Sequence, residues 1–402
     1  MPKWLLIFLL GIPGLVLAEV LHAAPLLVFT LAALALIPLA GLIGESTEVL
    51  AERVGPTAGG LLNATFGNAA ELIIGIAALL AGLQDVVLAS ITGSIIGNVL
   101  LVQGGATLAG GWKHGMQRFS ARNAGNYATI MALSVVGLAI PTLTSELGFT
   151  RNPAKDPISG GRLDSLSVII ACILLVSYVG YVAFSVFGVR ASRRLPSGHE
   201  EIGETPLHRI ERAEADESAR QMLAERKADT GIPQPGLAGF VAAWRLLWRH
   251  TLWLPVATLA LATAATAFAS EALVGTIGPV ADSAHLNKFF VGLIIIPVVG
   301  NAAEHFTAVT MALRDDMETS LAITAGSSVQ VALLVAPLLV IIGAVTGHPL
   351  DLQFSLLELV ILGMVAALFA LVSLDGRATW IEGLQLLAFY LIVAVSVFFL
   401  PV

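Results

Sequence analysis

The sequence predicts an all-α polytopic membrane protein with about 11 transmembrane helices, namely one extra N-terminal helix and two inverted five-helix repeats. Composition is the first reason, because apolar residues make up 56% of the 402 residues and charged residues only 12%. That is about half the usual charged share. A soluble fold cannot bury so much apolar surface, whereas a lipid bilayer can cover it. The other two reasons are the long apolar runs and a motif that occurs twice.

Charge and cysteine content exclude several classes of partner and site. The 28 acidic and 21 basic residues give a net charge of −7, so we expect no nucleic-acid partner. The single Cys172 lies in an apolar run. One cysteine excludes a disulfide framework and a multi-cysteine metal site.

Apolar runs long enough to cross a bilayer recur along the whole chain. Crossing roughly 30 Å of hydrocarbon takes about 20 helical residues. The predicted spans are 4–22, 25–50, 58–82, 85–110, 123–144, 165–188, 251–273, 286–313, 318–345, 353–374 and 380–400.

These spans divide the chain into four parts. Residues 1–22 form the extra helix, 25–188 the first repeat, 189–250 an acidic cytoplasmic linker and 251–402 the second repeat. The first run could instead be a cleaved signal peptide, since Lys3 precedes it and a small-residue cleavage sequence lies near Ala18.

The linker is the only extended polar segment. It carries nine acidic and five basic side chains between residues 196 and 230, and residues 206–228 favour a helix. Such a segment could be a solvated connector or an acidic regulatory helix near a pore mouth.

The distribution of basic residues predicts the orientation. With a cytoplasmic N-terminus, 17 of the 21 Lys and Arg residues fall on the cytoplasmic side. Long loops carry little weight in this rule. When the 190–250 connection is left out, the cytoplasmic side still has seven Lys and Arg residues and the opposite side four. We therefore expect the N-terminus in the cytoplasm.

One motif occurs twice at a constant spacing. The segment 66–72 (FGNAAEL) recurs as 299–305 (VGNAAEH), an offset of 233 residues. The same offset extends over about 25 positions and relates Asp85 to Glu318 and Gly93-Ser94 to Gly326-Ser327. The copies lie in the third and eighth predicted spans, which are five apart, and five is odd, so they enter the membrane from opposite sides. Inverted repeats are typical of secondary transporters, whose site lies near the midplane between the repeats.

Two carboxyl groups fall close to the bilayer centre in this repeat. Glu71 and Glu304 lie deep in their spans, and apart from Lys288 at the outer end of 286–313 no Lys or Arg occurs inside these two spans to pair with them. An ionised side chain there costs roughly 3 kcal/mol on insertion scales. Each Glu therefore needs a proton or a metal, unless it is kept permanently protonated or bonded to the backbone.

The polar residues around these carboxyls favour a hard cation. Asn68 and Asn301 stand three residues before the Glu residues, on the same helical face. Oxygen donors of this kind suit Ca²⁺, which takes six to eight oxygens, better than Zn²⁺ or Cu²⁺. Mn²⁺ and Na⁺ stay open on this chemistry. The neighbouring spans add Ser94, Asn98, Ser327, Ser328 and Gln330 as further candidates.

Other polar residues carry weaker hypotheses. His305 is either a packed or hydrogen-bonded histidine, or a proton relay or auxiliary ligand. Glu45 and Glu48, near the cytoplasmic end of the second span, and Glu271, near the outer end of the seventh, could recruit cations at pore mouths. A solvated helix end explains them equally well. Glu358 lies deeper and has no predicted role.

The chain resembles the Ca²⁺/H⁺ antiporter branch of the cation/Ca²⁺ exchanger superfamily. The resemblance spans almost the whole chain and is strongest in segments 60–75, 93–98, 300–305 and 326–337. It implies ten core helices and one extra helix, an acidic cytoplasmic helix, and Glu71 and Glu304 as a shared Ca²⁺ and H⁺ site. The sequence departs from the family at Gly97, where relatives commonly carry Ser.

The resemblance implies an antiporter in a bacterial plasma membrane that exports one cytoplasmic Ca²⁺ in exchange for about two protons. Its partners are then Ca²⁺, H⁺ and the lipid bilayer, with no cofactor beyond the transported ion. The nearest alternative is a proton antiporter for Mn²⁺, Na⁺ or K⁺. A channel is a further alternative. An intramembrane metalloenzyme lacks its motif here, because Glu304-His305 is in the wrong order for H-E-x-x-H.

Overall fold

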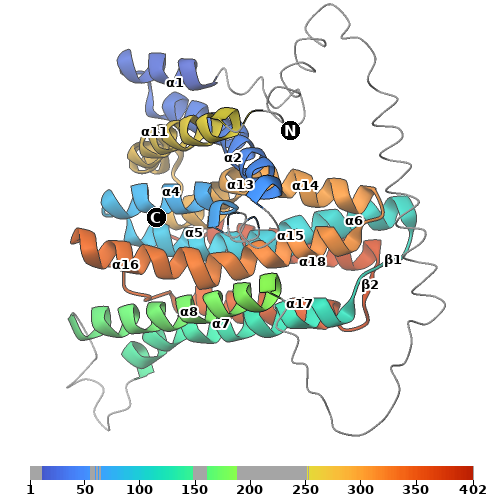
Figure 1. Ribbon diagram of the computed structural model, residues 1–402. Helices are drawn as coiled ribbons and strands as arrows, with labels where there is room; N and C mark the ends of the chain where they lie inside the picture. Colours follow the sequence, from blue (N-terminus) through green and yellow to red (C-terminus); the bar gives the residue numbers. More distant parts are fainter. Residues whose placement is uncertain are drawn as a thin grey trace, which may run out of the picture. The chain divides into compact units, whose positions relative to one another are not determined.

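The structure is a computed structural model that describes residues 11–54, 59, 62, 65–147, 161–187, 251 and 253–401. This part of the chain is almost entirely helical, and its α-helices pack beside one another with the two strands at the right-hand end of Figure 1. The long helices are α1 (Gly11–Val20), α2 (Pro25–Val54), α4 (Ala69–Leu80), α5 (Gln84–Ile96), α6 (Gln103–His114), α7 (Ala121–Leu147), α8 (Gly161–Phe187), α11 (Trp253–Ala284), α14 (Ala302–Leu313), α15 (Met317–Gln330), α16 (Ala336–Thr346), α17 (Leu356–Val372) and α18 (Trp380–Phe398).

Shorter elements connect or interrupt these helices. The two-residue strands β1 (Gln117–Arg118) and β2 (Arg377–Ala378) pair antiparallel. The remaining elements are the short helices α12 (Lys288–Phe290) and α13 (Ile296–Gly300) and the π-helical segments η2 (Gly97–Val102), η3 (Val291–Ile295) and η4 (Val331–Val335).

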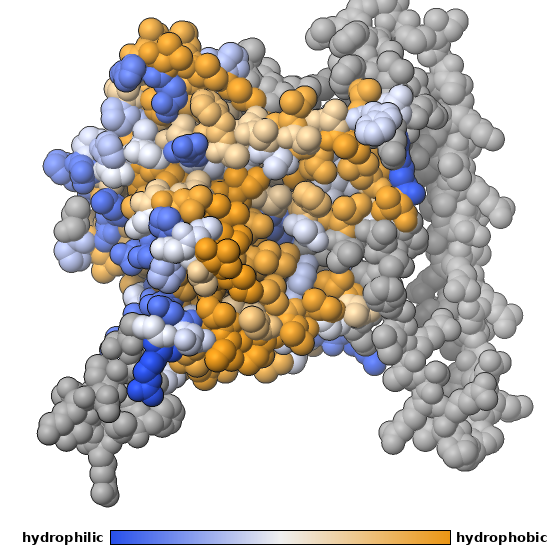
Figure 2. All heavy atoms as spheres, turned by 60° about the vertical axis from the view of Figure 1, so that its left-hand side comes forward, coloured by the Kyte–Doolittle hydropathy of each residue, from blue (hydrophilic) through white to orange (hydrophobic). Residues whose placement is uncertain are grey.

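Among the residues that the structure describes, seven helical segments are long and apolar enough to cross a membrane, and one bent pair would make an eighth. Three shorter apolar helices, α1, α4 and α17, lie in other predicted spans. On the face drawn in Figure 2, hydrophobic side chains cover a broad area and hydrophilic ones gather toward the left edge. The chain is therefore a multi-pass, nearly all-helical membrane protein. The count of eleven spans and the inverted orientation of the repeats stay predictions.

Several boundaries differ from the predicted spans. The seventh span was expected to end at residue 273, but α11 continues to Ala284 with Pro279 inside it. Gly and Pro in this stretch lower its hydropathy without ending the helix, which explains the difference. Residues 1–10, most of 55–64 and the predicted linker at 189–250 lie outside the described residues.

α6 of the first predicted half and α18 of the second approach each other so closely that their backbones are in contact. A Cβ atom at Gly111 of α6 would lie 2.5 Å from the Trp380 nitrogen of α18. On the facing helix, a Cβ at Gly383 would overlap the Leu108 nitrogen. Small residues allow membrane helices to approach this closely, so α6 and α18 pack backbone against backbone.

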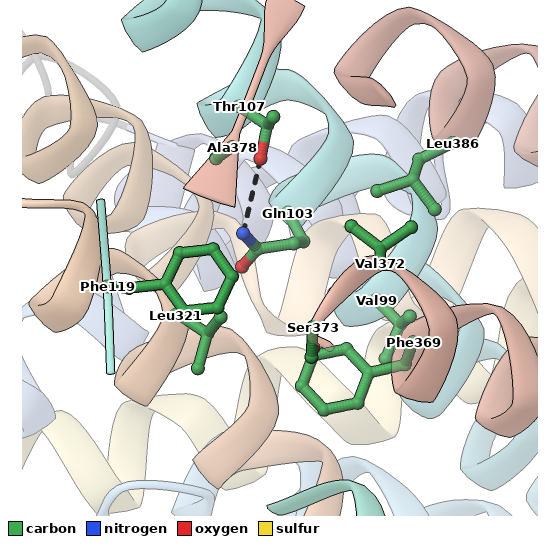
Figure 3. A pocket seen from close by; sticks show the side chains of 10 residues that line it. All are labelled: Val99, Gln103, Thr107, Phe119, Leu321, Phe369, Val372, Ser373, Ala378 and Leu386. Atoms are coloured by element: carbon green, nitrogen blue, oxygen red, sulfur yellow. Dashed lines mark hydrogen bonds between the residues drawn. The ribbon is translucent and has the colours of Figure 1, made fainter. Parts of the chain in front are cut away.

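A small internal cavity of about 10 Å³ lies beside the contact between α6 and α15 (Figure 3). Gln103 Nε2 donates to Thr107 Oγ1 over 3.2 Å, and Thr324 Oγ1 donates to Gln103 Oε1 over 2.5 Å. This volume is about the size that one water molecule needs. These bonds satisfy the buried Gln103 amide and connect the two halves.

The loop between α16 and α17 is held by two helices of the first predicted repeat. Ser167 accepts the Leu352 N–H over 3.1 Å, and Thr142 donates to the Leu352 carbonyl over 3.1 Å. Asp351 precedes Leu352 in this loop and lies beside Asp164 of α8. Burial, together with hydrogen bonding to Asp164 and repulsion by its carboxylate, raises the pKa of Asp351 to about 7.

This carboxyl makes stability depend on pH with a definite sign. The pKa of Asp351 is raised above the ordinary 3.8, so the folded protein binds more protons than the unfolded chain between these values. Stability is then lost as pH rises toward and through about 7. We expect Asp351→Asn to raise the melting temperature relative to wild type at pH 8 and to change it less at pH 5. Equal shifts at the two pH values, in melting curves at constant ionic strength, would contradict this coupling.

Candidate cation-binding site

The two predicted carboxylates lie in the first turns of α4 and α14, and each of these helices begins directly after an interruption of the helical conformation. α4 begins after Asn68 and carries Glu71 at its third position, while α14 begins after Asn301 and carries Glu304 at its third position. The α13–α14 pair bends by 60° at this break. The positive end of a helix dipole favours an anion in its first turn, so both helix starts favour ionised carboxylates.

Glu71 of the first repeat meets the second repeat at Gly300. A Cβ atom at residue 300 would lie 3.6 Å from Glu71 Cγ. The Glu71 carboxyl is also close enough to Glu304 to be repelled electrostatically. The structure therefore brings together two carboxyl groups that lie 233 residues apart in the sequence.

A chain of hydrogen bonds links the amides and hydroxyls around the carboxyls. Asn68 Nδ2 donates to Gln330 Oε1 in a short hydrogen bond. Ser327 Oγ donates to Asn68 Oδ1 over 3.1 Å and accepts from Asn98 Nδ2 over 2.9 Å. Asn68, Asn98 and Ser327 are all at most 5% exposed. Four predicted site residues from both repeats thus form one network.

Several buried oxygens of this site have no hydrogen-bond partner among the described residues. They are Asn98 Oδ1, Asn301 Oδ1 and Glu304 Oε2, and Asn301 Nδ2 is also without a partner. Native proteins pair almost all buried polar groups or use them to hold an ion or water. These acceptors, with the two carboxyl groups, form a donor set suited to a hard cation.

The two halves differ at two positions of the network. Asn98 has Val331 as its counterpart at the 233-residue offset. Gln330 has Gly97 as its counterpart at the 233-residue offset, and nothing lies within 4 Å of a Cβ placed there. Asn68 therefore has an amide partner across the repeats, whereas its counterpart Asn301 has none within the described part of the chain.

Three predicted residues take no part in this hydrogen-bond network. Ser328 donates instead to the Thr324 carbonyl of its own helix over 2.9 Å. His305 is half-buried, and its Nε2 has no hydrogen-bond partner among the described residues. Ser94 is buried on α5 beside the tightly packed Gly93.

A cavity of about 990 Å³ leads to the two carboxyls from one end of the protein. Its walls come from the C-terminal half of α2, the first turn of α4, and α14 and α15. Glu45, Glu48, Glu52 and Glu318 line it, so the approach to the site is acidic. Glu271, the other predicted pore-mouth acid, is exposed in the middle of α11 and is not among the residues lining this cavity.

Two glycines at equivalent positions show that α5 and α15 are packed differently. A Cβ at Gly93 of α5 would overlap the Leu293 carbonyl and lie 2.6 Å from Pro297 Cγ. A Cβ at Gly326 of α15 would have Tyr127 as its nearest neighbour, at 4.0 Å, and Gly326 lines the cavity. The site is thus approached along α15, while the matching face of α5 is closed by η3.

The sequence offered no role for two further acids. Glu358 is 3% exposed and forms a capping box with Ser355 at the start of α17. Thr92 of α5 donates to Glu358 Oε1 over 3.2 Å. Glu318 accepts from Asn123 Nδ2 over 2.7 Å and from the Ser120 N–H over 2.5 Å, at the start of α7. The Ser-x-x-Glu spacing before an apolar run was the available signal for Glu358.

No cluster of three or more His, Cys, Asp or Glu residues that could hold a metal occurs within the described part of the chain. A cation at this site would therefore need amide, hydroxyl or backbone oxygens beside the two carboxyls. That requirement fits Ca²⁺ or another hard ion and does not fit a cysteine- or histidine-rich zinc site.

Known proteins match the chain over nearly its whole length. The family model described as sodium/calcium exchanger protein matches residues 24–187 and 254–399. The chain is 39% identical to a Ca²⁺/H⁺ antiporter of Aphanothece halophytica over 394 residues, which is 98% of this chain and 96% of that relative. It is 34% identical to the Ca²⁺/H⁺ antiporter ChaA of Bacillus subtilis, covering 97% of each chain.

A solved structure agrees with these sequence matches. Native YfkE superposes with a TM-score of 0.76 at 30% identity, covering 99% of this chain and 100% of that one. The helical core and the paired acidic motifs thus occur in a chain that matches these relatives along both repeats. The chain belongs to the Ca²⁺/H⁺ antiporter family of the cation/Ca²⁺ exchanger superfamily.

Proposed function

We propose that this protein exchanges Ca²⁺ for H⁺ across the membrane, with Glu71 and Glu304 binding Ca²⁺ or protons in turn. One observation carries the proposal: a carboxyl from each repeat stands at the inner end of an acidic cavity, beside buried oxygens that lack partners. The names of the matched relatives support both ions.

The charge on the site explains why the two ions compete. With both carboxyls ionised the pair carries a double negative charge, which Ca²⁺ neutralises. With both protonated the pair is neutral without metal. A form of the site that carries an unpaired charge supports transport poorly, because a charge at the bilayer centre is costly. Exchange of about two protons for each Ca²⁺ follows from this balance.

Alternating access is supported by the two glycines. The face of α15 at Gly326 is open and the face of α5 at Gly93 is closed against η3. We infer that the opposite state reverses these contacts, so that α15 packs closely and α5 opens. Equivalent elements of inverted repeats exchange roles in this way in secondary transporters.

The orientation of the chain then gives the direction of transport. With a cytoplasmic N-terminus, α2 ends on the cytoplasmic side, and the cavity lined by its C-terminal half opens there. Cytoplasmic Ca²⁺ would enter along Glu45, Glu48 and Glu52. In a bacterial plasma membrane the inward proton gradient would drive its export.

Transport in proteoliposomes tests this function against its alternatives. We expect an imposed pH gradient to drive Ca²⁺ uptake, and collapse of the gradient with an ionophore to stop net uptake. Excess Mn²⁺, Na⁺ and K⁺ added one at a time should inhibit weakly if Ca²⁺ is the preferred ion. Rapid Ca²⁺ flux without any proton gradient would indicate a channel, and strong block by Na⁺ or K⁺ would assign the site to a monovalent ion.

A further inference from the structure

An apolar groove runs along the outer surface of α6 and α18, away from the acidic cavity. It measures about 540 Å³ and is lined by Gly105, Leu108, Ala109, Trp112, Lys113, Leu313, Trp380 and Leu384. The α6 residues follow the spacing of one helical face. A Cβ at Gly105 would meet nothing within 4 Å, so this glycine leaves the groove open.

The dimensions and lining of the groove fit part of an acyl chain. From Gly105 to Trp112 the helix rises about 10 Å, and the residues of this stretch that line the groove are apolar. Trp112 and Trp380 stand at that end, where their rings meet edge to face with centroids 6.1 Å apart. Trp112 is 78% exposed. Exposed tryptophans are typical of the headgroup level of a bilayer.

A cationic group is fixed at the same end. Lys113 Nζ donates to the Leu313 carbonyl over 2.8 Å, and His114 Nε2 lies 2.9 Å from the same oxygen. This bond holds the ammonium at the mouth of the groove and uses one of its three protons. Arg314 directly follows Leu313.

Two more cations stand close by without acidic partners. Arg118 and Arg377 are directly opposite each other in the β1–β2 pair, and both are exposed. Like charges in this position repel. No salt bridge joins Arg118, Arg314 or Arg377 to a carboxylate within the described ranges.

Four acids that lie near these cations and Trp380 in the sequence already accept hydrogen bonds from other groups. Asp316 and Glu382 cap helices, Asp315 accepts from Gln117, and Asp375 accepts the Arg377 N–H. The cations therefore remain available for an anion beside the groove.

We propose that this groove binds a phospholipid with an anionic headgroup, from the leaflet on the side of the acidic cavity. One acyl chain lies along α6 and α18, the headgroup phosphate meets Lys113, and the tryptophans flank the glycerol region. This site is separate from the cation site and does not depend on the proposed transport function.

The position of the groove connects the lipid to the transport helices. Leu313 ends α14, the helix whose first turn carries Glu304. A lipid bridging α6, α18 and the end of α14 stabilises the arrangement of helices seen here. We therefore expect anionic lipid to raise the thermal stability of the purified protein.

The test compares phosphatidylglycerol with phosphatidylcholine of identical acyl chains, added to the full-length protein in detergent. Melting temperature and native mass spectrometry of retained lipid are the readouts, and neither needs transport. Phosphatidylglycerol should stabilise wild type more than phosphatidylcholine does. Lys113→Gln keeps a donor for Leu313 but removes the charge, and should reduce this difference by half or more. Lys288→Gln, at an exposed lysine of α12, is the matched control and should keep it.

A second variant tests the groove without changing charge. Gly105→Leu fills the groove and should abolish retention of phosphatidylglycerol, while Ca²⁺-dependent stabilisation stays as in wild type. Equal stabilisation by the two lipids, or full preference for phosphatidylglycerol in Lys113→Gln, would overturn the proposal. It would also fail if Gly105→Leu instead dissociated an oligomer, since the groove would then bind a second copy of the chain.

Discussion

Glu71→Gln and Glu304→Gln are each expected to lower proton-driven Ca²⁺ uptake by at least about 100-fold, equivalent to about 2.7 kcal/mol. Each substitution removes one of the two charges that neutralise the ion and one of the two groups that carry protons. Glutamine keeps the size and an oxygen of the side chain, so folding should be preserved. Initial rates of Ca²⁺ uptake into proteoliposomes, normalised to incorporated protein, measure the effect.

Glu271→Gln is the matched control for these variants. Glu271 is exposed on α11 and is not among the residues that line the cavity, so this variant should transport like wild type. Robust uptake by either Glu71→Gln or Glu304→Gln would remove that residue from the proposed ion site. An equal loss in all three variants would point to a general effect of removing negative charge.

Gly326→Ala and Gly93→Ala should have opposite effects on stability and share a loss of transport. At Gly93 a methyl group overlaps the Leu293 carbonyl, so the state described here should lose about 3 kcal/mol or more. At Gly326 there is room for a methyl group in this state. If α15 packs closely in the opposite state, Gly326→Ala leaves the protein folded but prevents switching.

Melting temperature and Ca²⁺ flux together separate these effects. Gly326→Ala should melt at or above the wild-type temperature and lose at least about 90% of transport. Gly97→Ala is the control, because it adds the same methyl group to a buried glycine with open space around it. Full transport by Gly326→Ala would contradict the exchange of roles between α5 and α15.

Much of the candidate site could be predicted from the sequence because its motif occurs in both halves of the chain. The constant offset of 233 residues picks out Asn68, Glu71 and Gly93 with their counterparts. The cost of burying two unpaired carboxylates then restricts their chemistry to protons or a cation.

Other features of the site depend on tertiary structure and could not be predicted. Spacing alone could not show that Ser328 bonds to its own helix, or that Gln330 reaches across to Asn68. Gly67 and Gly300 stand directly before Asn68 and Asn301, where the helix breaks occur, but helical periodicity gives no bend angle. The open face of α15 and the closed face of α5 belong to one state of the protein. The two helices carry the same Gly-Ser motif, so the sequence could not show which of the two faces is open.

The central claim is that two carboxyls, one from each repeat, bind either Ca²⁺ or protons. Proton release on Ca²⁺ binding to the purified protein in weakly buffered solution tests it most directly, with Mg²⁺ as the reference ion. We predict that wild type releases protons in proportion to bound Ca²⁺, and that Glu71→Gln/Glu304→Gln neither binds Ca²⁺ nor releases protons. Stoichiometric Ca²⁺ binding and proton release by the double variant would show that the exchange occurs elsewhere in the protein.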